Sequence, residues 1–347
     1  MKRKVLTLII LISCSVCANA FSADWDISKL TDNSYTDQLP RANDSGDVVW
    51  QGYVDAYGDI FFYDHSLKTT TRLTNDPYSD GQQRINANGD IAWQGGSDRD
   101  IFLYDNSAKT TSNLSNTPFG PYAEESPFIN DNTDVMWRGQ QQWYYYDHAN
   151  NSTTTFPGSR IQGFDYSDTN SQIAKNGITA QNSGGTLYWS NGINTTGLGT
   201  IYDAFGLSDN GKAAWSGPGG IYAFDGATKK LIYDTSYTQN RPDINDDGNI
   251  VWQGRDANGV QQIYMYTLST GEIIQLSNSP KYGNLPFMQA ANLYPQINNS
   301  GEVFWQGYDG TDYEIYRASA NVVPEPATMF LLPLGLAGLR FLKRKKA

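Results

Sequence analysis

Short segments in which apolar and polar residues alternate recur along most of the chain and predict β-strands. The most regular segments carry a tryptophan and follow a polar turn, as in residues 43–52, 86–95 and 245–254. Each begins with Asn, has Gly three residues later and ends in Trp-Gln-Gly. Because one such unit cannot bury its apolar face alone, the repetition predicts copies that pack against one another.

The spacing of the copies predicts the fold class. Aligned copies are separated by between 37 and 53 residues, with Lys175 at the tryptophan position of a degenerate fourth copy. The tryptophans that define the other copies are Trp50, Trp93, Trp137, Trp215, Trp252 and Trp305. A period near forty suits a four-stranded propeller blade, whereas helical repeats are disfavoured because the segments are rich in Tyr, Thr, Ile and Val. We predict an all-β propeller over residues 24–320 with seven blades, or six if the fourth copy is irregular.

The remaining strands of each repeat can also be placed. An aromatic strand such as residues 59–64 follows each tryptophan strand, and a polar strand ending in Leu-Thr or Leu-Ser comes next, as in residues 72–74. The last copy lacks this polar strand, but residues 27–32 carry the same pattern before the first tryptophan. We therefore predict that the N-terminal strand completes the last blade and closes the ring. The Asn-x-x-Gly turns are predicted hairpin connections, with calcium binding as the alternative.

The repeats resemble the TolB-like, WD40-like family of β-propeller repeats. The resemblance lies in a Pro-containing loop, a Gly-containing turn, an aromatic strand and an Ile-Tyr strand, seen in residues 242–266. The usual Ser-Pro-Asp-Gly turn of that family is replaced here by Ile-Asn-x-x-Gly. The sialidase Asp-box is a rival interpretation, but Trp50 follows Asp44 one residue too late, which would send the side chain to the opposite face. The resemblance implies the fold and leaves the function open.

The N-terminus predicts export. Residues 2–4 are basic, residues 5–16 are mostly apolar, and Ala18 and Ala20 form an A-x-A signal-peptidase site, so residues 1–20 are predicted to be a signal peptide. A lipobox around Cys14, which would leave that cysteine lipidated, is the alternative. Cys14 and Cys17 are the only cysteines, so cleavage after Ala20 would leave a chain without disulfides or metal-thiolate sites.

The C-terminus carries a specific short signal. Residues 322–347 combine Pro324, Glu325 and Pro326 with an uncharged run at 327–339. A basic cluster follows, made of Arg340, Lys343, Arg344, Lys345 and Lys346. This order resembles a PEP-CTERM sorting domain, which implies a Gram-negative, exopolysaccharide-associated protein that an exosortase-type enzyme processes near the Pro-Glu-Pro. The apolar run is shorter than the roughly twenty residues of a spanning helix, so we expect transient membrane contact, with a membrane anchor as the alternative.

Charge narrows the set of partners. Setting aside eight basic residues and one acidic residue in the two terminal segments leaves 17 basic and 35 acidic residues, a formal charge near −18. Such a surface disfavours nucleic acid and anionic polysaccharide unless divalent cations bridge them. Neutral glycans, cations and basic proteins are easier to accommodate.

Candidate catalytic groups are few. His65 and His148 occupy equivalent Tyr-Asp-His positions, which is typical of a repeated strand end rather than of a catalytic base. Acidic pairs such as Glu124 with Glu125 leave glycoside hydrolysis open, since sequence shows no pKa difference between them. The motifs HExxH and GxSxG do not occur in the sequence, nor does a phosphate-binding glycine loop.

These observations predict an exported, noncatalytic surface or matrix propeller that binds a glycan or protein partner. The aromatic run at residues 143–146 would suit sugar stacking if its rings reach water, although packing between blades is the alternative. An extracellular carbohydrate-active enzyme that uses acidic residues near the central channel is the second hypothesis, and a purely structural matrix component is the third. We expect no cofactor, with calcium as the alternative.

Overall fold

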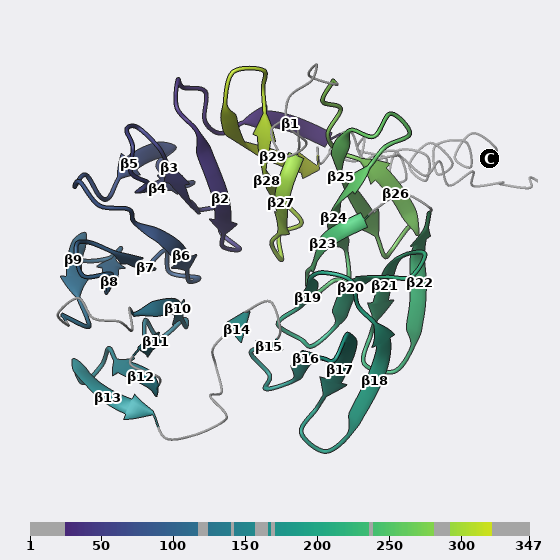
Figure 1. Cartoon of the computed structure of the whole chain (residues 1–347), viewed down its shortest axis with the longest axis horizontal. Coiled ribbons are helices and arrows are strands. Elements are labelled where there is room, and N and C mark those ends of the chain that lie inside the picture. Colours follow the sequence, from purple (N-terminus) through teal and green to yellow (C-terminus); the bar gives the residue numbers. More distant parts are fainter. Residues whose placement is uncertain are drawn as a thin grey trace, which may run out of the picture. The chain divides into compact units, whose positions relative to one another are not determined.

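The computed structural model describes residues 25–116, 124–139, 142–156, 166–167, 171–235, 239–280 and 292–320. Every regular element within these ranges is a β-strand, and the strands form seven antiparallel sheets. Residues Trp25–Ser319 form one compact unit, in which the sheets lie around a common centre (Figure 1). The prediction of an all-β propeller is confirmed, with seven blades rather than six.

The sheets are named blades 1 to 7 in chain order. Blade 1 consists of β2 (Asp37–Ala42), β3 (Val48–Gly52), β4 (Asp59–Asp64) and β5 (Thr69–Arg72). Blade 2 consists of β6 (Gly81–Ile85), β7 (Ile91–Gly95), β8 (Asp100–Asp105) and β9 (Thr110–Asn113). Blade 3 consists of β10 (Glu125–Ile129), β11 (Val135–Gly139), β12 (Gln142–Asp147) and β13 (Ser152–Phe156).

The other blades include one five-stranded sheet. Blade 4 consists of β14 (Tyr166–Ser167), β15 (Ser171–Ile173), β16 (Thr179–Ser183), β17 (Thr186–Ser190) and β18 (Thr195–Thr200). Blade 5 consists of β19 (Phe205–Leu207), β20 (Ala213–Gly217), β21 (Gly220–Phe224) and β22 (Lys229–Asp234). Blade 6 consists of β23 (Gln239–Ile244), β24 (Ile250–Arg255), β25 (Gln261–Thr267) and β26 (Glu272–Gln275). Blade 7 consists of β27 (Asn292–Ile297), β28 (Val303–Tyr308), β29 (Tyr313–Ala320) and β1 (Trp25–Lys29).

The repeated tryptophan lies on the second strand of six blades and is at most 1% exposed in each. In every case its indole stacks on the aromatic residue directly opposite on the third strand, as Trp50 does on Phe61 and Trp305 on Tyr316. The six ring pairs have centroids 5.4–5.8 Å apart and interplanar angles of 11–16°. The period of the sequence therefore reflects one aromatic stack in each of these six blades, buried between neighbouring sheets.

The predicted alignment of the degenerate repeat, which placed Lys175 at the tryptophan position, is wrong in blade 4. Lys175 lies in a turn, and Gln181 takes the tryptophan position, where it faces Tyr188 across the strand pair. The turn repeats the hydrogen bonds of the other copies: Ala174 N donates to Ile178 O, as Asn43 N donates to Asp47 O. Without an indole to cover it, Tyr188 is 39% exposed. Alignment on a missing tryptophan failed because the turn, and not the indole, is the feature that this copy retains.

The aromatic run at residues 143–146 packs within the structure. Tyr144 stacks on Trp137 with ring centroids 5.6 Å apart, and Tyr146 is buried. Trp143 and Tyr145 pack against the buried pair Phe128 and Met136. The run therefore fills space inside and beside blade 3, as the packing alternative predicts.

The N-terminal strand pairs with β29 as the outermost strand of blade 7, which is the strand exchange predicted from the sequence. Its Leu-Thr pair repeats the contacts of the same pair in blade 1. Ile315 N donates to Thr31 Oγ1 at 2.9 Å, as Ile60 N donates to Thr74 Oγ1 at 2.9 Å. Strands from the two ends of the propeller thus share one blade, while closure of the complete ring stays a prediction.

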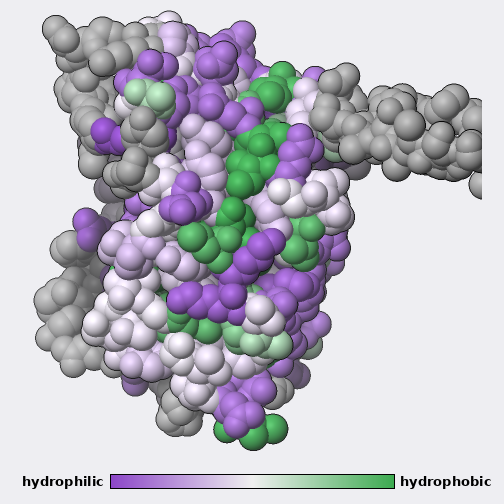
Figure 2. Space-filling view, turned by 90° about the vertical axis from the view of Figure 1, so that its right-hand side faces the viewer, coloured by the Kyte–Doolittle hydropathy of each residue, from purple (hydrophilic) through white to green (hydrophobic). Residues whose placement is uncertain are grey.

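Figure 2 shows the side of the propeller on which β22 and β26 lie. Apolar residues occur there in several groups separated by hydrophilic and neutral ones. Among the exposed large apolar residues of the described chain, Leu231 on β22 is 39% exposed and Ile193 in the β17–β18 turn is 91% exposed. Scattered exposure of this kind is ordinary for a soluble surface.

A polar residue thirteen positions before the tryptophan lies beside the indole in several blades. Trp252 Nε1 donates to Gln239 Oε1 at 2.6 Å, and Trp305 Nε1 donates to Asn292 Oδ1 at 3.0 Å. Trp50 Nε1 donates to the carboxylate of Asp37 at 2.8 Å. Blade 2 has Asp80 at this place, where burial raises its pKa to about 6. An amide suits the position better than a carboxylate because it carries no charge to desolvate.

We expect Asp80→Asn to stabilise the protein at pH 7.5 by about 1–3 kcal/mol and to leave stability at pH 4 nearly unchanged. Because the folded-state pKa is raised, the folded chain binds more protons than the unfolded chain between about pH 4 and pH 6. The parent therefore loses stability as pH rises through this range, and the amide variant does not. Urea unfolding at both pH values measures the difference, with Asp26→Asn on the exposed strand β1 as control. A variant no more stable than the parent at pH 7.5 would contradict the expectation.

Candidate ligand cavity at the centre of the propeller

A cavity of about 380 Å³ lies where the innermost strands of the blades approach the Asn-x-x-Gly turns. All seven blades contribute to its lining, which exposes more polar than apolar surface. The charged residues in the lining are Arg41, Asp44, Arg84, Asp131, Lys175, Asp209, Arg241 and Asp243. A volume of this size lies within the range of small-molecule sites.

The turn asparagines form an inter-blade chain of hydrogen bonds around the cavity. Asn245 Nδ2 donates to Asn298 O, and Asn298 Nδ2 donates to Asn43 O, at 3.1 and 3.0 Å. Asn43 and Asn86 continue the chain to the carbonyls of Asn86 and Asn130, at 3.1 and 3.0 Å. Each asparagine Oδ1 also accepts backbone N–H groups of its own turn, as Asn43 does from Ser45 and Asp47. Asparagine is thus required both by the turn and by the contact between blades.

The chain of asparagine hydrogen bonds is interrupted at blades 4 and 5, where Ala174 and Ser208 take the asparagine position. Lys175 provides the connection there. Its ammonium lies 3.2 Å from Asp131 of blade 3 and 2.9 Å from Asp209 of blade 5. The two carboxylates raise the pKa of Lys175 against the effect of burial, so the ammonium remains charged. Ion pairs therefore replace amide hydrogen bonds between these three blades.

A β-bulge recurs in the innermost strand beside the cavity. Leu39, Gln82, Ser126, Arg241 and Tyr294 have φ between 49° and 56°, each at the register shift of its strand pair. Two of these backbones are held by the Trp-Gln-Gly glutamine of the preceding blade. Tyr294 N donates to Gln253 Oε1 at 2.9 Å, and Leu39 N donates to Gln306 Oε1 at 3.2 Å. Bulges re-aim side chains, and here they bring Arg241 and Tyr294 into the lining.

Two arginines of the cavity lining pack against aromatic rings. The guanidinium of Arg241 lies 4.7 Å from the ring centroid of Tyr294, and that of Arg84 lies 5.5 Å from the ring centroid of Phe128. Asp243 accepts a hydrogen bond from Ile297 N at 2.9 Å. Burial raises the pKa of Asp243 to about 6, and the nearby charge of Arg41 opposes this rise. The cavity lining thus combines arginine side chains, amides and the carboxyl of Asp243, whose pKa is about 6.

The acidic turns use their carboxylates in hydrogen bonds of the fold. Asp47 Oδ2 accepts from Asn43 Nδ2 at 3.0 Å, and its Oδ1 accepts from His65 N at 2.8 Å. Asp134 bonds Asn130 Nδ2 and His148 N in the same way, at 3.1 and 3.0 Å. These contacts support the turn interpretation over calcium binding. They also place both histidines at equivalent strand ends, away from the lining of the cavity.

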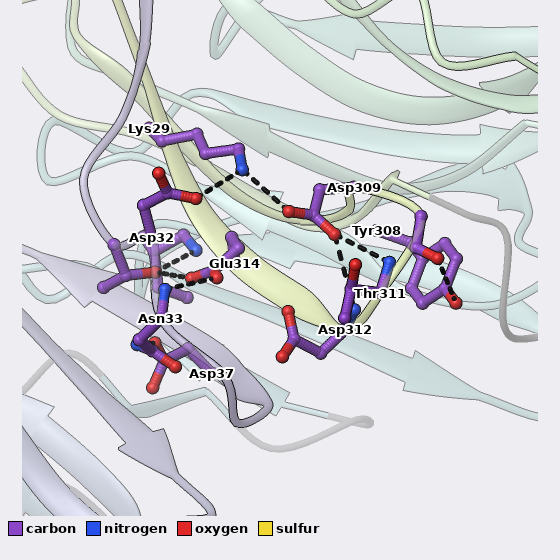
Figure 3. Close-up of polar contacts among 12 residues, drawn as sticks. Lys29, Asp32, Asn33, Asp37, Tyr308, Asp309, Thr311, Asp312 and Glu314 are labelled. Carbon is purple, nitrogen blue, oxygen red and sulfur yellow. Dashed lines mark hydrogen bonds and ion pairs between the residues drawn. The ribbon is translucent and has the colours of Figure 1, made fainter.

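A second polar cluster lies where β1 meets blade 7 (Figure 3). Carboxylate oxygens of Asp32, Asp309 and Glu314 lie within 4.8 Å of one another. Lys29 Nζ lies 2.7 Å from both Asp32 and Asp309. Glu314 accepts from Thr31 Oγ1 at 2.5 Å and from Asn33 N at 2.8 Å. The ammonium of Lys29 offsets part of this negative charge, and Glu314 is held by Thr31 and Asn33. We therefore interpret the cluster as a contact that fastens the N-terminal strand to β29.

None of the site residues predicted from the sequence lies in the described lining of this cavity. The predicted processing residues Ala18, Ala20, Pro324, Glu325 and Pro326 lie outside the described residues, as does the basic cluster at 340–346. The repeated tryptophans lie in the blades and not in the cavity lining. The arginines of the cavity lining were not predicted from the sequence, although Arg41 and Arg84 occupy the same place in two repeats, two residues before the turn asparagine. The described residues contain no helix that is long and apolar enough to cross a membrane.

Comparison with known proteins adds two findings. Residues 322–346 match the PEP-CTERM protein-sorting motif. No curated protein matches the chain.

Several solved structures share the fold. Oligogalacturonate lyase from Vibrio parahaemolyticus is 12% identical with a TM-score of 0.54, and the match covers 87% of this chain and 97% of that one. The β-propeller domain of the Trilobed protease from Pyrococcus furiosus is 11% identical with a TM-score of 0.54, over 85% and 100% of the two chains. Virginiamycin B lyase from Staphylococcus aureus is 11% identical with a TM-score of 0.53, over 85% and 99%. At these identities the likeness establishes the fold alone.

Fold and tail together define the class of this protein: a β-propeller that carries a C-terminal PEP-CTERM sorting motif. The motif indicates export across the inner membrane to the cell surface, with processing by exosortase-type machinery.

Proposed function

We propose that this exported propeller is a noncatalytic surface protein that binds a glycan in its central cavity. The proposal rests on the cavity of about 380 Å³, which has a mainly polar lining to which all seven blades contribute. Side-chain amides such as Gln172 and Gln296 suit sugar hydroxyls, because an amide both donates and accepts hydrogen bonds. The bulged strands and the asparagine chain hold the wall rigidly, which lowers the entropic cost of binding.

A matched pair of variants tests whether the cavity is the site. Ala87 lies in the cavity lining, whereas Ala108 lies in an exposed outer turn of the same blade. We expect Ala87→Trp to abolish binding of the full chain to a panel of neutral and acidic oligosaccharides, and Ala108→Trp to leave it unchanged. Calorimetry measures binding, and chromatography of each mixture detects any product. Equal binding by both variants, or no binding by the parent, would overturn the proposal.

Enzymatic activity is a second candidate that one observation favours. Burial raises the pKa of Asp243 in the cavity to about 6, and the negative charge of Asp209 adds to the rise. A carboxyl with this pKa suits general acid catalysis, and a second carboxylate would serve as its partner. Released oligosaccharide in the parent, lost in Asp243→Asn, would establish the enzyme. Binding without product supports the noncatalytic proposal.

The tail gives a separate prediction. Replacement of Pro324-Glu325-Pro326 by three alanines should block C-terminal processing, because the processing machinery would lose the Pro-Glu-Pro sequence of the sorting motif. We expect an uncleaved chain retained in the membrane fraction, detected by intact mass and cell fractionation. An unchanged far-ultraviolet circular dichroism spectrum controls for folding of the propeller. Normal mature mass and surface location would show that these residues are dispensable.

A further inference from the structure

The charged residues of the cavity occupy two positions of the repeat. Both are counted from the turn asparagine, or from Ala174 and Ser208 in blades 4 and 5. We call the residue two positions earlier, on the innermost strand, the wall residue. We call the residue one position later, in the turn, the mouth residue. The wall residues that line the cavity are Arg41, Arg84, Gln172, Asp243 and Gln296, joined by Arg241 from the bulge of β23. The charged mouth residues are Asp44, Asp131, Lys175 and Asp209. The wall thus carries three arginines and one carboxyl, although the propeller as a whole is strongly acidic.

The mouth carboxylates are engaged within the protein. Asp44 accepts from Asn299 N at 2.8 Å and from Asn299 Nδ2 at 3.1 Å. Asp131 accepts from Ala87 N at 3.0 Å, and Lys175 bridges Asp131 to Asp209. Backbone N–H groups and the lysine therefore stabilise these negative charges. A ligand that passes the mouth would meet the arginine side chains of the wall.

Two of the wall arginines are held by neighbouring groups, and Arg241 Nε also lies 4.0 Å from the carboxylate of Asp203. Arg241 stacks on Tyr294, and Arg84 stacks on Phe128 while its Nη1 donates to Gln83 O at 3.1 Å. Arg41 comes from the neighbouring blade 1 and lines the same cavity. Planar guanidinium groups in fixed positions are suited to carboxylate and phosphate groups, which they bind through paired N–H donors.

We propose that the cavity binds a sugar bearing an anionic group, with the anion among Arg41, Arg84 and Arg241 and the hydroxyls against Gln172 and Gln296. This inference rests on the proposed function and names the charge class of its ligand. The acidic exterior repels long polyanions, so the ligand is a short oligosaccharide or a chain end. Asp243 faces the same space, and protonation of this carboxyl below about pH 6 would strengthen binding of an anion.

The fold itself supplies a conservative test substitution. Gln296 takes in blade 7 the position that Arg84 takes in blade 2, so Arg84→Gln introduces a side chain that the position already accepts. Arg99→Gln, in an exposed turn of blade 2, is the matched control. The probes for the full chain are a glucuronic-acid oligosaccharide, the same sugar with a phosphate ester in place of the carboxylate, and a neutral glucose oligosaccharide of equal length.

We expect an acidic probe to bind at least tenfold more tightly than the neutral one, and Arg84→Gln to remove this preference while Arg99→Gln retains it. The acidic probe with the higher affinity identifies the anion as carboxylate or phosphate. Equal affinity for acidic and neutral probes, or an unchanged preference in Arg84→Gln, would overturn the inference. If Ala87→Trp still blocks neutral binding in that case, the proposed function stands; if no probe binds, both fail.

Discussion

Trp252→Ala should lower the free energy of unfolding by about 3–5 kcal/mol, the usual cost of truncating a fully buried tryptophan. The side chain is 0% exposed and stacks on Tyr264 with ring centroids 5.8 Å apart. Its ring also lies 5.5 Å from that of Tyr233, which belongs to blade 5, so truncation opens a cavity between two blades. The buried acceptor Gln239 Oε1 would lose the indole N–H that donates to it at 2.6 Å. Urea unfolding followed by circular dichroism measures the loss.

Two further variants separate packing from hydrogen bonding at this position. Trp252→Phe retains most of the ring contact but removes the N–H, so we expect a smaller loss of about 1–3 kcal/mol. Leu268→Ala, at a residue 46% exposed after strand β25 of the same blade, should change stability by no more than about 0.5 kcal/mol. If Trp252→Ala proves no more costly than Leu268→Ala, the indole stack does not stabilise the blades.

The repeat positions of the fold could be predicted because they impose the same physical requirement in every blade. Each tryptophan must fill the space between sheets, and each turn requires a residue such as Gly46, whose φ is 82°. Blade 4 was misaligned because Gln181 makes no indole stack, although Gly177 at φ 82° retains the turn. The turn glycine therefore aligns this degenerate copy better than the tryptophan position does, although Thr133 takes the place of the glycine in blade 3.

The candidate site was harder to predict because it depends on what differs between repeats. Equivalent positions hold arginine at Arg41 and Arg84 but an acid at Asp243, so periodicity alone assigns them no common role. The bulge that turns Arg241 into the cavity has no fixed residue type, since Leu39, Gln82 and Tyr294 adopt the same positive φ. Net charge was also a poor guide here, because an acidic propeller surrounds three wall arginines.

Thr31→Val should destabilise the propeller by about 2–3 kcal/mol, because the substitution preserves shape and removes two hydrogen bonds at a buried position. Thr31 Oγ1 donates to Glu314 Oε2 at 2.5 Å and accepts from Ile315 N at 2.9 Å. Glu314 is 0% exposed, and burial raises its pKa, so the loss of a donor leaves a desolvated carboxylate less well stabilised.

Two comparisons show whether the exchanged strand docks as firmly as a strand within one continuous blade. In blade 1, Thr74 Oγ1 donates to Asp59 Oδ1 at 3.3 Å and accepts from Ile60 N at 2.9 Å, so Thr74→Val removes the equivalent contacts. We expect Thr31→Val to cost at least as much, since its bond to the carboxylate is shorter, whereas Ser28→Ala on the exposed part of β1 should be nearly neutral. Urea unfolding compares the three variants, and limited proteolysis detects release of β1. Were Thr31→Val as mild as Ser28→Ala, the N-terminal strand would cover blade 7 without stabilising it.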